Sequence, residues 1–78
     1  MKMDKAQDYF RDGMIKSFRA VRRPMASGWL LEFEGVSGSI WVMKLAKGGF
    51  RVFKSVDSII TTVEEITGKK PLQGFKVL

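Results

Sequence analysis

Apolar residues recur at a helical period near both ends of the chain. In residues 3–14 the spacing is three or four, which predicts a helix with one apolar stripe. Residues 55–67 show the same period, with Ser55 placed to cap the first turn and Gly68 placed to end the helix. The predicted inward positions are Met3, Ala6, Phe10 and Met14 in the first helix and Val56, Ile59, Ile60, Val63 and Ile66 in the second.

Between these helices, apolar and polar residues alternate in a way that predicts β-strands separated by glycine-containing turns. The predicted strands are Trp29–Glu34, 39–45 and 50–54, and the predicted turns are 35–38 and 47–49. Residues 15–23 fit either a strand or a continued helix, and we favour a strand because strands and tight turns follow directly. Phe75 and Val77 can add an edge strand near the end of the chain.

These elements predict an α+β fold that forms a single domain over residues 1–78. We expect an antiparallel three- or four-stranded meander with an N-terminal helix and a C-terminal helix packed on the sheet. The C-terminal helix is expected to cover the more apolar sheet face, which comprises Trp29, Leu31, Phe33, Trp41, Met43, Leu45 and Val52.

The opposite sheet face is also predicted to be apolar, through Leu30, Ile40, Val42 and Phe53. A face of this kind is rarely left bare in water. We therefore expect it to be an interaction face, covered either by the N-terminal helix or by a second copy of the chain. Among the aromatic residues, most of which we assign to the core, Phe53 is the one expected to be exposed beside basic residues.

Composition then excludes several kinds of chemistry. The 78 residues include no cysteine and no histidine, so the chain has no disulfide, no thiolate or imidazole metal site and no histidine-dependent nucleophile. Asp4, Asp8 and Asp12 lie in line on one helix face rather than converging on an ion. Glu32 and Glu34 are expected to pair with cross-strand partners among Arg19, Lys44 and Arg51. We expect no catalytic residues, no metal, no cofactor and no small-molecule substrate.

Positive charge is the strongest functional signal in the sequence. The net charge is +6, and the basic residues gather before Pro24, around the turn at 47–49 and in residues 69–78. If the sheet forms as predicted, Arg19, Arg23, Lys44 and Arg51 share one face, with Lys47 and Lys54 at its rim. The residues predicted to contact phosphates are Arg19, Arg22, Arg23, Lys44, Lys47, Arg51 and Lys54.

Two functions remain open on these grounds. The first is a nucleic-acid-binding accessory protein, with DNA the expected partner. The alternative is a non-enzymatic protein-interaction or homodimerisation module that uses the second apolar sheet face. Because residues 1–10 lack the apolar core of a signal peptide and no run of about 20 apolar residues occurs, we expect a cytoplasmic protein without a membrane partner.

Two stretches of the chain carry a family resemblance. Arg22-Arg23-Pro24 with Gly28-Trp29, followed by the ten residues from Gly49 to Ser58, resembles a pattern in small partition- or replication-accessory proteins of plasmids and mobile elements. The same succession of a strand, Arg-x-Phe and a capped helix is similar to three-stranded DNA-binding modules at the N-termini of some integrases. The resemblance implies a DNA-linked, non-enzymatic role and assigns no individual site residues.

Overall fold

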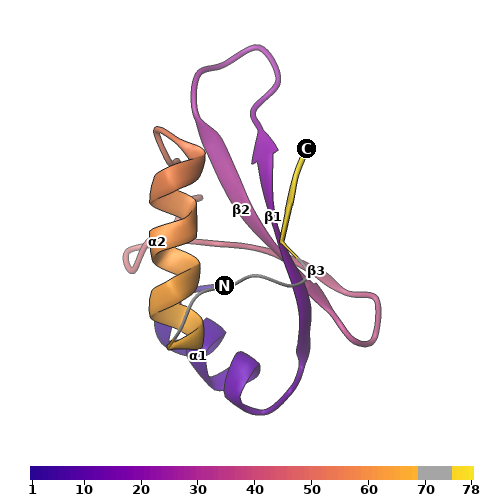
Figure 1. Cartoon of the computed structure of the whole chain (residues 1–78). Helices are drawn as coiled ribbons and strands as arrows, with labels where there is room; N and C mark the ends of the chain where they lie inside the picture. Colours follow the sequence, from indigo (N-terminus) through magenta and orange to yellow (C-terminus); the bar gives the residue numbers. More distant parts are fainter. Residues whose placement is uncertain (69–74) are drawn as a thin grey trace.

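The computed structural model describes residues 1–68 and 75–78 (Figure 1). Its elements are, in chain order, α1 (Met3–Arg11), β1 (Ile15–Arg22), β2 (Trp29–Gly35), β3 (Ile40–Val42), α2 (Val56–Thr67) and β4 (Phe75–Val77). The predicted α+β class, both helices and the strand at residues 15–23 are therefore confirmed. Neither helix in the described part of the chain is long and apolar enough to cross a membrane.

The strands form one sheet in the order β3-β2-β1-β4. β2 is antiparallel to both β1 and β3, so these three strands form the predicted meander. β4 is parallel to β1, and the expectation of a purely antiparallel sheet is wrong. The reason is that α2 carries the chain from β3 at one edge to β4 at the other, and such a crossover joins strands that run in the same direction.

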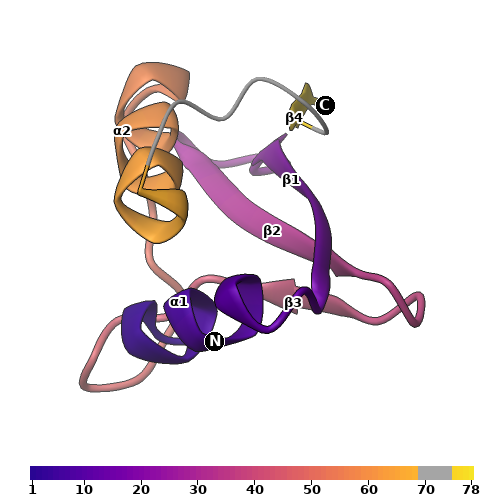
Figure 2. The same cartoon turned by 60° about the horizontal axis from the view of Figure 1, so that its bottom comes forward.

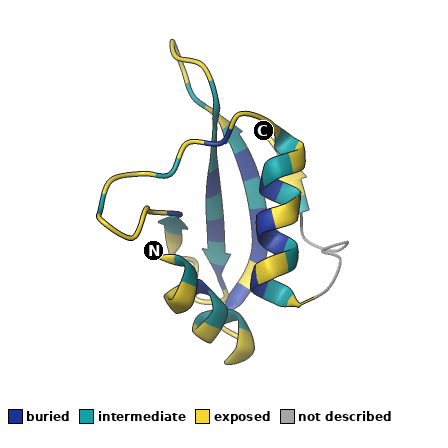
Figure 3. Ribbon diagram, turned by 90° about the vertical axis from the view of Figure 1, so that its left-hand side faces the viewer, coloured by how far each residue is buried: buried dark blue, intermediate teal, exposed yellow. Residues whose placement is uncertain are grey.

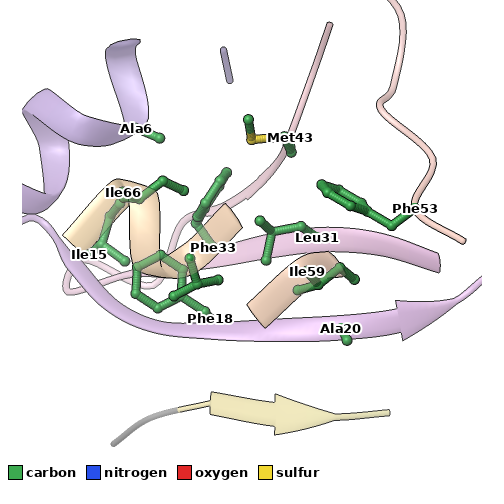
Figure 4. Packing of buried hydrophobic residues seen from close by; sticks show 11 residues of the cluster. Ala6, Ile15, Phe18, Ala20, Leu31, Phe33, Met43, Phe53, Ile59 and Ile66 are labelled. Atoms are coloured by element: carbon green, nitrogen blue, oxygen red, sulfur yellow. The ribbon is translucent and has the colours of Figure 1, made fainter. Parts of the chain in front are cut away.

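Both helices lie on the same side of this sheet (Figure 2). Phe18 and Ala20 of β1 pair with Phe33 and Leu31 of β2, so all four side chains share one face. The helices place their buried residues against this face, as Figure 4 shows for Ala6 of α1 and for Ile59 and Ile66 of α2. The buried cluster consists of Ala6, Ile15, Phe18, Ala20, Leu31, Phe33, Met43, Phe53, Ile59, Val63 and Ile66.

α2 begins and ends where the local sequence predicts. The Ser55 hydroxyl accepts a hydrogen bond of 3.2 Å from the Ser58 N–H, which satisfies one of the free donors of the first turn. Gly68 ends the helix in the left-handed conformation at φ 80°, and its N–H donates to the Glu64 carbonyl. The β-branched residues of this helix are held by packing, since Ile59, Val63 and Ile66 are all buried.

The opposite side of the sheet, here called the helix-free face, carries no helix from the described residues. By register it displays Ser17, Arg19, Val21, Leu30, Glu32, Glu34, Ile40, Val42 and Lys76. Leu30, Ile40 and Val42 lie on this face as predicted, but α1 packs on the other side of the sheet, so the expectation that the N-terminal helix covers them is wrong. Leu30 and Val42 are half-buried by their neighbours in the sheet, and Ile40 is exposed.

Candidate nucleic-acid interface

The edge strand beside β2 is interrupted by a loop rich in basic residues. Val42 pairs with Glu32, so an unbroken β3 would bring residue 45 opposite Trp29. Phe53, eight positions later, lies there instead. The eight additional residues, 44–51, form a small ribbon that we call the edge loop, and Figure 3 shows it projecting on the left as mostly exposed chain.

Backbone hydrogen bonds hold the edge loop in a defined shape. Lys44 and Phe50 form an antiparallel bridge, and the Arg51 N–H donates to the Met43 carbonyl at 3.0 Å. The turn predicted at 47–49 is confirmed, with Gly48 at φ 100°, a conformation that glycine adopts without steric cost. The predicted separate strand at 50–54 is wrong, because only Phe50 and Phe53 form isolated bridges.

Where the chain rejoins the sheet, two arginines stack on two neighbouring aromatic rings. The N–H of Trp29 donates to the Phe53 carbonyl and the N–H of Phe53 donates to the Trp29 carbonyl, both at 2.8 Å. The Arg22 guanidinium lies 5.0 Å from the Trp29 ring centroid, and the Arg51 guanidinium lies 4.7 Å from the Phe53 ring centroid. These cation–π contacts place both guanidinium groups along the same edge of the molecule.

Three further predicted cations lie near this edge. Arg23 donates a hydrogen bond of 3.0 Å to the Ser27 carbonyl in the β1–β2 turn. Lys47 lies in the edge loop, and Lys54 follows Phe53 directly; both are exposed. Together with the residues already placed, they form what we call the basic strip: Arg22, Arg23, Lys44, Lys47, Arg51 and Lys54.

Arg19 does not join the basic strip. It lies on the helix-free face, where its Nε donates to Glu32 Oε1 at 2.9 Å, and both side chains are largely buried. Arg19 therefore differs from Arg23, Lys44 and Arg51 in having a carboxylate partner, and the expectation that the four share one face stays a prediction. The strand register places Arg19 opposite Glu32. The free energy of the fold is lower when the two charges pair than when either one is partly buried without a partner.

No carboxylate pairs with the basic strip in the described part of the chain, where the ion pairs are Arg11–Asp8 and Arg19–Glu32. The sequence itself contains no acidic residue from Gly35 to Val56. Of the third cluster of positive charge, Lys76 lies on the helix-free face, while Lys69 and Lys70 lie outside the described residues. Positive charge on the strip is thus available to an anionic partner.

A groove of about 600 Å³ runs between the edge loop and the start of α1. Its lining includes Lys2, Asp4 and Gln7 from the helix side and Lys44, Leu45 and Arg51 from the loop side. Burial, and then the charges of Lys44 and Lys2, lower the pKa of the Met1 ammonium group beside it. Asp4 is the one acid in this lining, and the groove is otherwise positively charged.

Two phenylalanines differ from expectation in their exposure to solvent. Phe53, predicted to be exposed on the second apolar face, is 3% exposed and packs in the core near Leu31 (Figure 4). Phe50, which we assigned to the core, is 57% exposed on the edge loop. Its place directly after two glycines was the sequence signal for a loop position, and strand alternation across residues 50–54 outweighed that signal.

Comparison with models of protein families, with curated protein sequences and with solved structures finds no significant match to this chain. The resemblance to accessory proteins of plasmids and mobile elements thus stays a prediction from residues 22–58. The basic strip and the helix-free face are therefore the surfaces on which a function can be proposed.

Proposed function

We propose that this protein binds nucleic acid, DNA first, through the basic strip, without catalysing a reaction. The observation that carries the proposal is that six cations, from the end of the β1–β2 hairpin, the edge loop and its return to the sheet, have no carboxylate partner in residues 1–68 and 75–78. Lysine and arginine contacts to phosphates release counterions, which makes such a surface suited to a polyanion. A cytoplasmic setting and the role of an accessory protein fit this activity and belong to the same proposal.

Two features of the strip favour binding over mere solubility. Arg22 and Arg51 are held on the rings of Trp29 and Phe53, so less side-chain entropy is lost when they contact a phosphate. The hairpin of β1 and β2 and the edge loop both project from the body of the protein (Figures 1 and 3), which lets their cations reach a partner.

The test is the salt dependence of DNA binding, measured by fluorescence anisotropy with labelled duplex and single-stranded DNA. If all six cations contact phosphates, the affinity for duplex falls on the order of 1,000-fold between 50 and 200 mM salt. The double variant Lys44→Ala/Lys47→Ala then lowers the slope of log affinity against log salt by about two.

A matched control separates the strip from net charge alone. Lys16 and Lys76 lie close enough to Glu34 on the helix-free face to lower the pKa of its carboxyl. The double variant Lys16→Ala/Lys76→Ala removes the same charge and should leave the slope unchanged. Equal weakening by both double variants, or no binding at low salt, contradicts the proposal.

The helix-free face favours a second candidate, self-association. It combines apolar positions with charges of both signs, because Arg19 lies on β1 and Glu32 and Glu34 lie on β2. Two copies related by a twofold axis can place these opposite charges face to face. Sedimentation of the pure protein tests this candidate: a concentration-dependent dimer that Val42→Arg abolishes supports it, and a strict monomer excludes it.

A further inference from the structure

The edge loop presents an aromatic ring to solvent in the middle of positive charge. The chain contains nine aromatic residues, all within the described ranges, and Phe50 is the one among them that is exposed. Its exposed fraction of 57% compares with 3% for Phe53, three residues later. Phe50 is therefore the aromatic side chain of the described residues that is most open to a partner.

The surroundings of Phe50 indicate the charge of that partner. Lys44 is the bridge partner of Phe50, and side chains directly opposite in an antiparallel pair lie on the same side of the ribbon. Lys47 lies at the turn and Arg51 follows Phe50, while residues 44–51 contain no acid. Lys44 therefore lies on the same side of the ribbon as the ring, and two further cations lie within three residues of Phe50 in the sequence, which fits an anionic partner with flat groups between its charges.

The edge loop is also shaped before it binds. Its ends are joined by the Lys44–Phe50 bridge and by the Arg51–Met43 hydrogen bond, and Leu45 N–H donates to the Gly49 carbonyl at 2.9 Å. The Arg51 side chain rests on Phe53, which is anchored in the core. A ring carried on such a support loses little conformational freedom when it stacks on a planar group.

We propose that the basic strip takes single-stranded rather than duplex nucleic acid, with a base stacked on Phe50 and the flanking phosphates on Lys44, Lys47 and Arg51. This inference rests on the proposed function and adds the kind of strand that is recognised. An unpaired strand exposes the faces of its bases to a protein ring, whereas in a duplex those faces are stacked on one another. The remaining cations, Arg22, Arg23 and Lys54, continue the path of positive charge along the sheet edge.

An anionic lipid surface is the other class of partner that a basic loop with an apolar tip can meet. The structure favours the nucleic acid because cations also occur beyond the loop, at Lys54 and at Arg23 in the β1–β2 turn. The exposed apolar residues of the loop are Leu45, Ala46 and Phe50, and the exposed Val52 follows them. Lipid binding is therefore an outcome of the test rather than part of the proposal.

The experiment compares an oligothymidylate of about 12 nucleotides, within the roughly 4–16 nucleotides that single-strand sites cover, with a duplex of the same length. Binding is followed by fluorescence anisotropy of the labelled DNA at low salt. We expect the intact chain to prefer the single strand. Phe50→Ala should weaken single-strand binding by roughly 5- to 150-fold, the loss of one base–aromatic stack, and leave duplex binding within about twofold.

Matched variants separate stacking from general apolar contact. Phe50→Tyr keeps an aromatic ring and should retain single-strand affinity, whereas Phe50→Leu should lose it as Phe50→Ala does. Val36, 65% exposed in the turn between β2 and β3, provides the control: Val36→Ala should change neither affinity. Circular dichroism of each variant confirms that the fold is retained.

The outcomes distinguish this inference from the function on which it rests. Duplex binding as tight as single-strand binding, with no effect of Phe50→Ala, overturns the single-strand inference and leaves the proposed function standing. No binding to either DNA at low salt overturns both. Binding to vesicles that contain phosphatidylglycerol, lost in Phe50→Ala while oligothymidylate is not bound, overturns both in favour of a lipid surface.

Discussion

At the scale of single residues, charge pairing decides which predicted cations are available to a partner. Arg19 was grouped with the other basic residues because of its sign, yet its guanidinium lies 2.9 Å from Glu32 in the half-buried part of the helix-free face. Arg22 and Arg51 instead rest on aromatic rings and keep their charge uncompensated by any carboxylate in the described part of the chain. Of the seven cations predicted to contact phosphates, Arg19 is the one that pairs with a carboxylate in the described part of the chain.

The Ser17–Glu34 pair yields a prediction at the same scale. The Ser17 hydroxyl donates to Glu34 Oε1 at 2.9 Å, and this bond, followed by the charges of Lys16, Lys76 and Arg19, holds the pKa of Glu34 below its ordinary value while burial opposes them. A lowered folded-state pKa means that Glu34 stabilises the fold above the unfolded-state pKa, and that this contribution disappears as pH falls through the folded-state pKa.

Ser17→Ala should raise the pKa of Glu34 part of the way to its ordinary value, since the lysine and arginine charges remain. The loss of its stabilising contribution should then begin at a higher pH than in the original chain. Carboxyl chemical shifts in an NMR titration measure the pKa. Ser39→Ala, which affects an exposed hydroxyl in the β2–β3 turn, should leave it unchanged; an unaltered pKa in Ser17→Ala contradicts the assignment.

At the scale of elements, the sheet edge beside β2 is the part of the fold that the sequence predicts least well. This edge begins with β3 and continues, after the edge loop, at Phe53. Residues 39–45 and 50–54 have the composition of two strands, but the structure makes them two pieces of one interrupted edge, with the edge loop between them. The rejoining point requires close approach of the backbone at Gly28. A Cβ atom there would lie 2.5 Å from Val52 Cγ1 and 3.1 Å from the Phe53 carbonyl oxygen.

Two glycine substitutions test this element. Gly28 and Gly48 both have φ near 100°, so an alanine at either position meets the left-handed penalty of about 1–2 kcal/mol. A Cβ at Gly48 would meet no atom within 4 Å. Gly28→Ala should therefore reduce the free energy of unfolding by about 1–3 kcal/mol more than Gly48→Ala, the added cost of overpacking. Urea unfolding measures both, and equal losses would contradict close packing at the rejoining point.

At the scale of the whole molecule, one core beneath two helices must hold a chain of 78 residues. A chain of this length has a stability of roughly 4–12 kcal/mol, so a single large core residue represents much of the total. Because both helices lie on one side of the sheet, Phe53 is enclosed in the same cluster as Leu31 and Phe33 although it follows an exposed loop. Phe53 therefore contributes both to the stability of the molecule and to the shape of its basic strip.

Phe53→Ala and Phe50→Ala should differ sharply in stability. Removal of the buried ring should cost about 3–5 kcal/mol, whereas removal of the exposed ring should change stability by no more than about 0.5 kcal/mol. Thermal and urea unfolding of the two variants provide the comparison. If Phe50→Ala proved as destabilising as Phe53→Ala, the exposed position of Phe50, and with it the stacking role, would be wrong.

The sequence by itself determined those features that depend on neighbours a few residues away. The two helices, the cap at Ser55, the ending at Gly68 and the turn at 47–49 follow from local hydrogen bonds and backbone freedom. Tertiary contacts were needed to show that Phe53 points inward, that Arg19 rather than Lys44 or Arg51 pairs with Glu32, that α1 packs beside α2 and that β4 runs parallel to β1. Each of these depends on segments far apart in the chain meeting in space, because the free energy of burial and of charge pairing belongs to the contact and not to either segment alone.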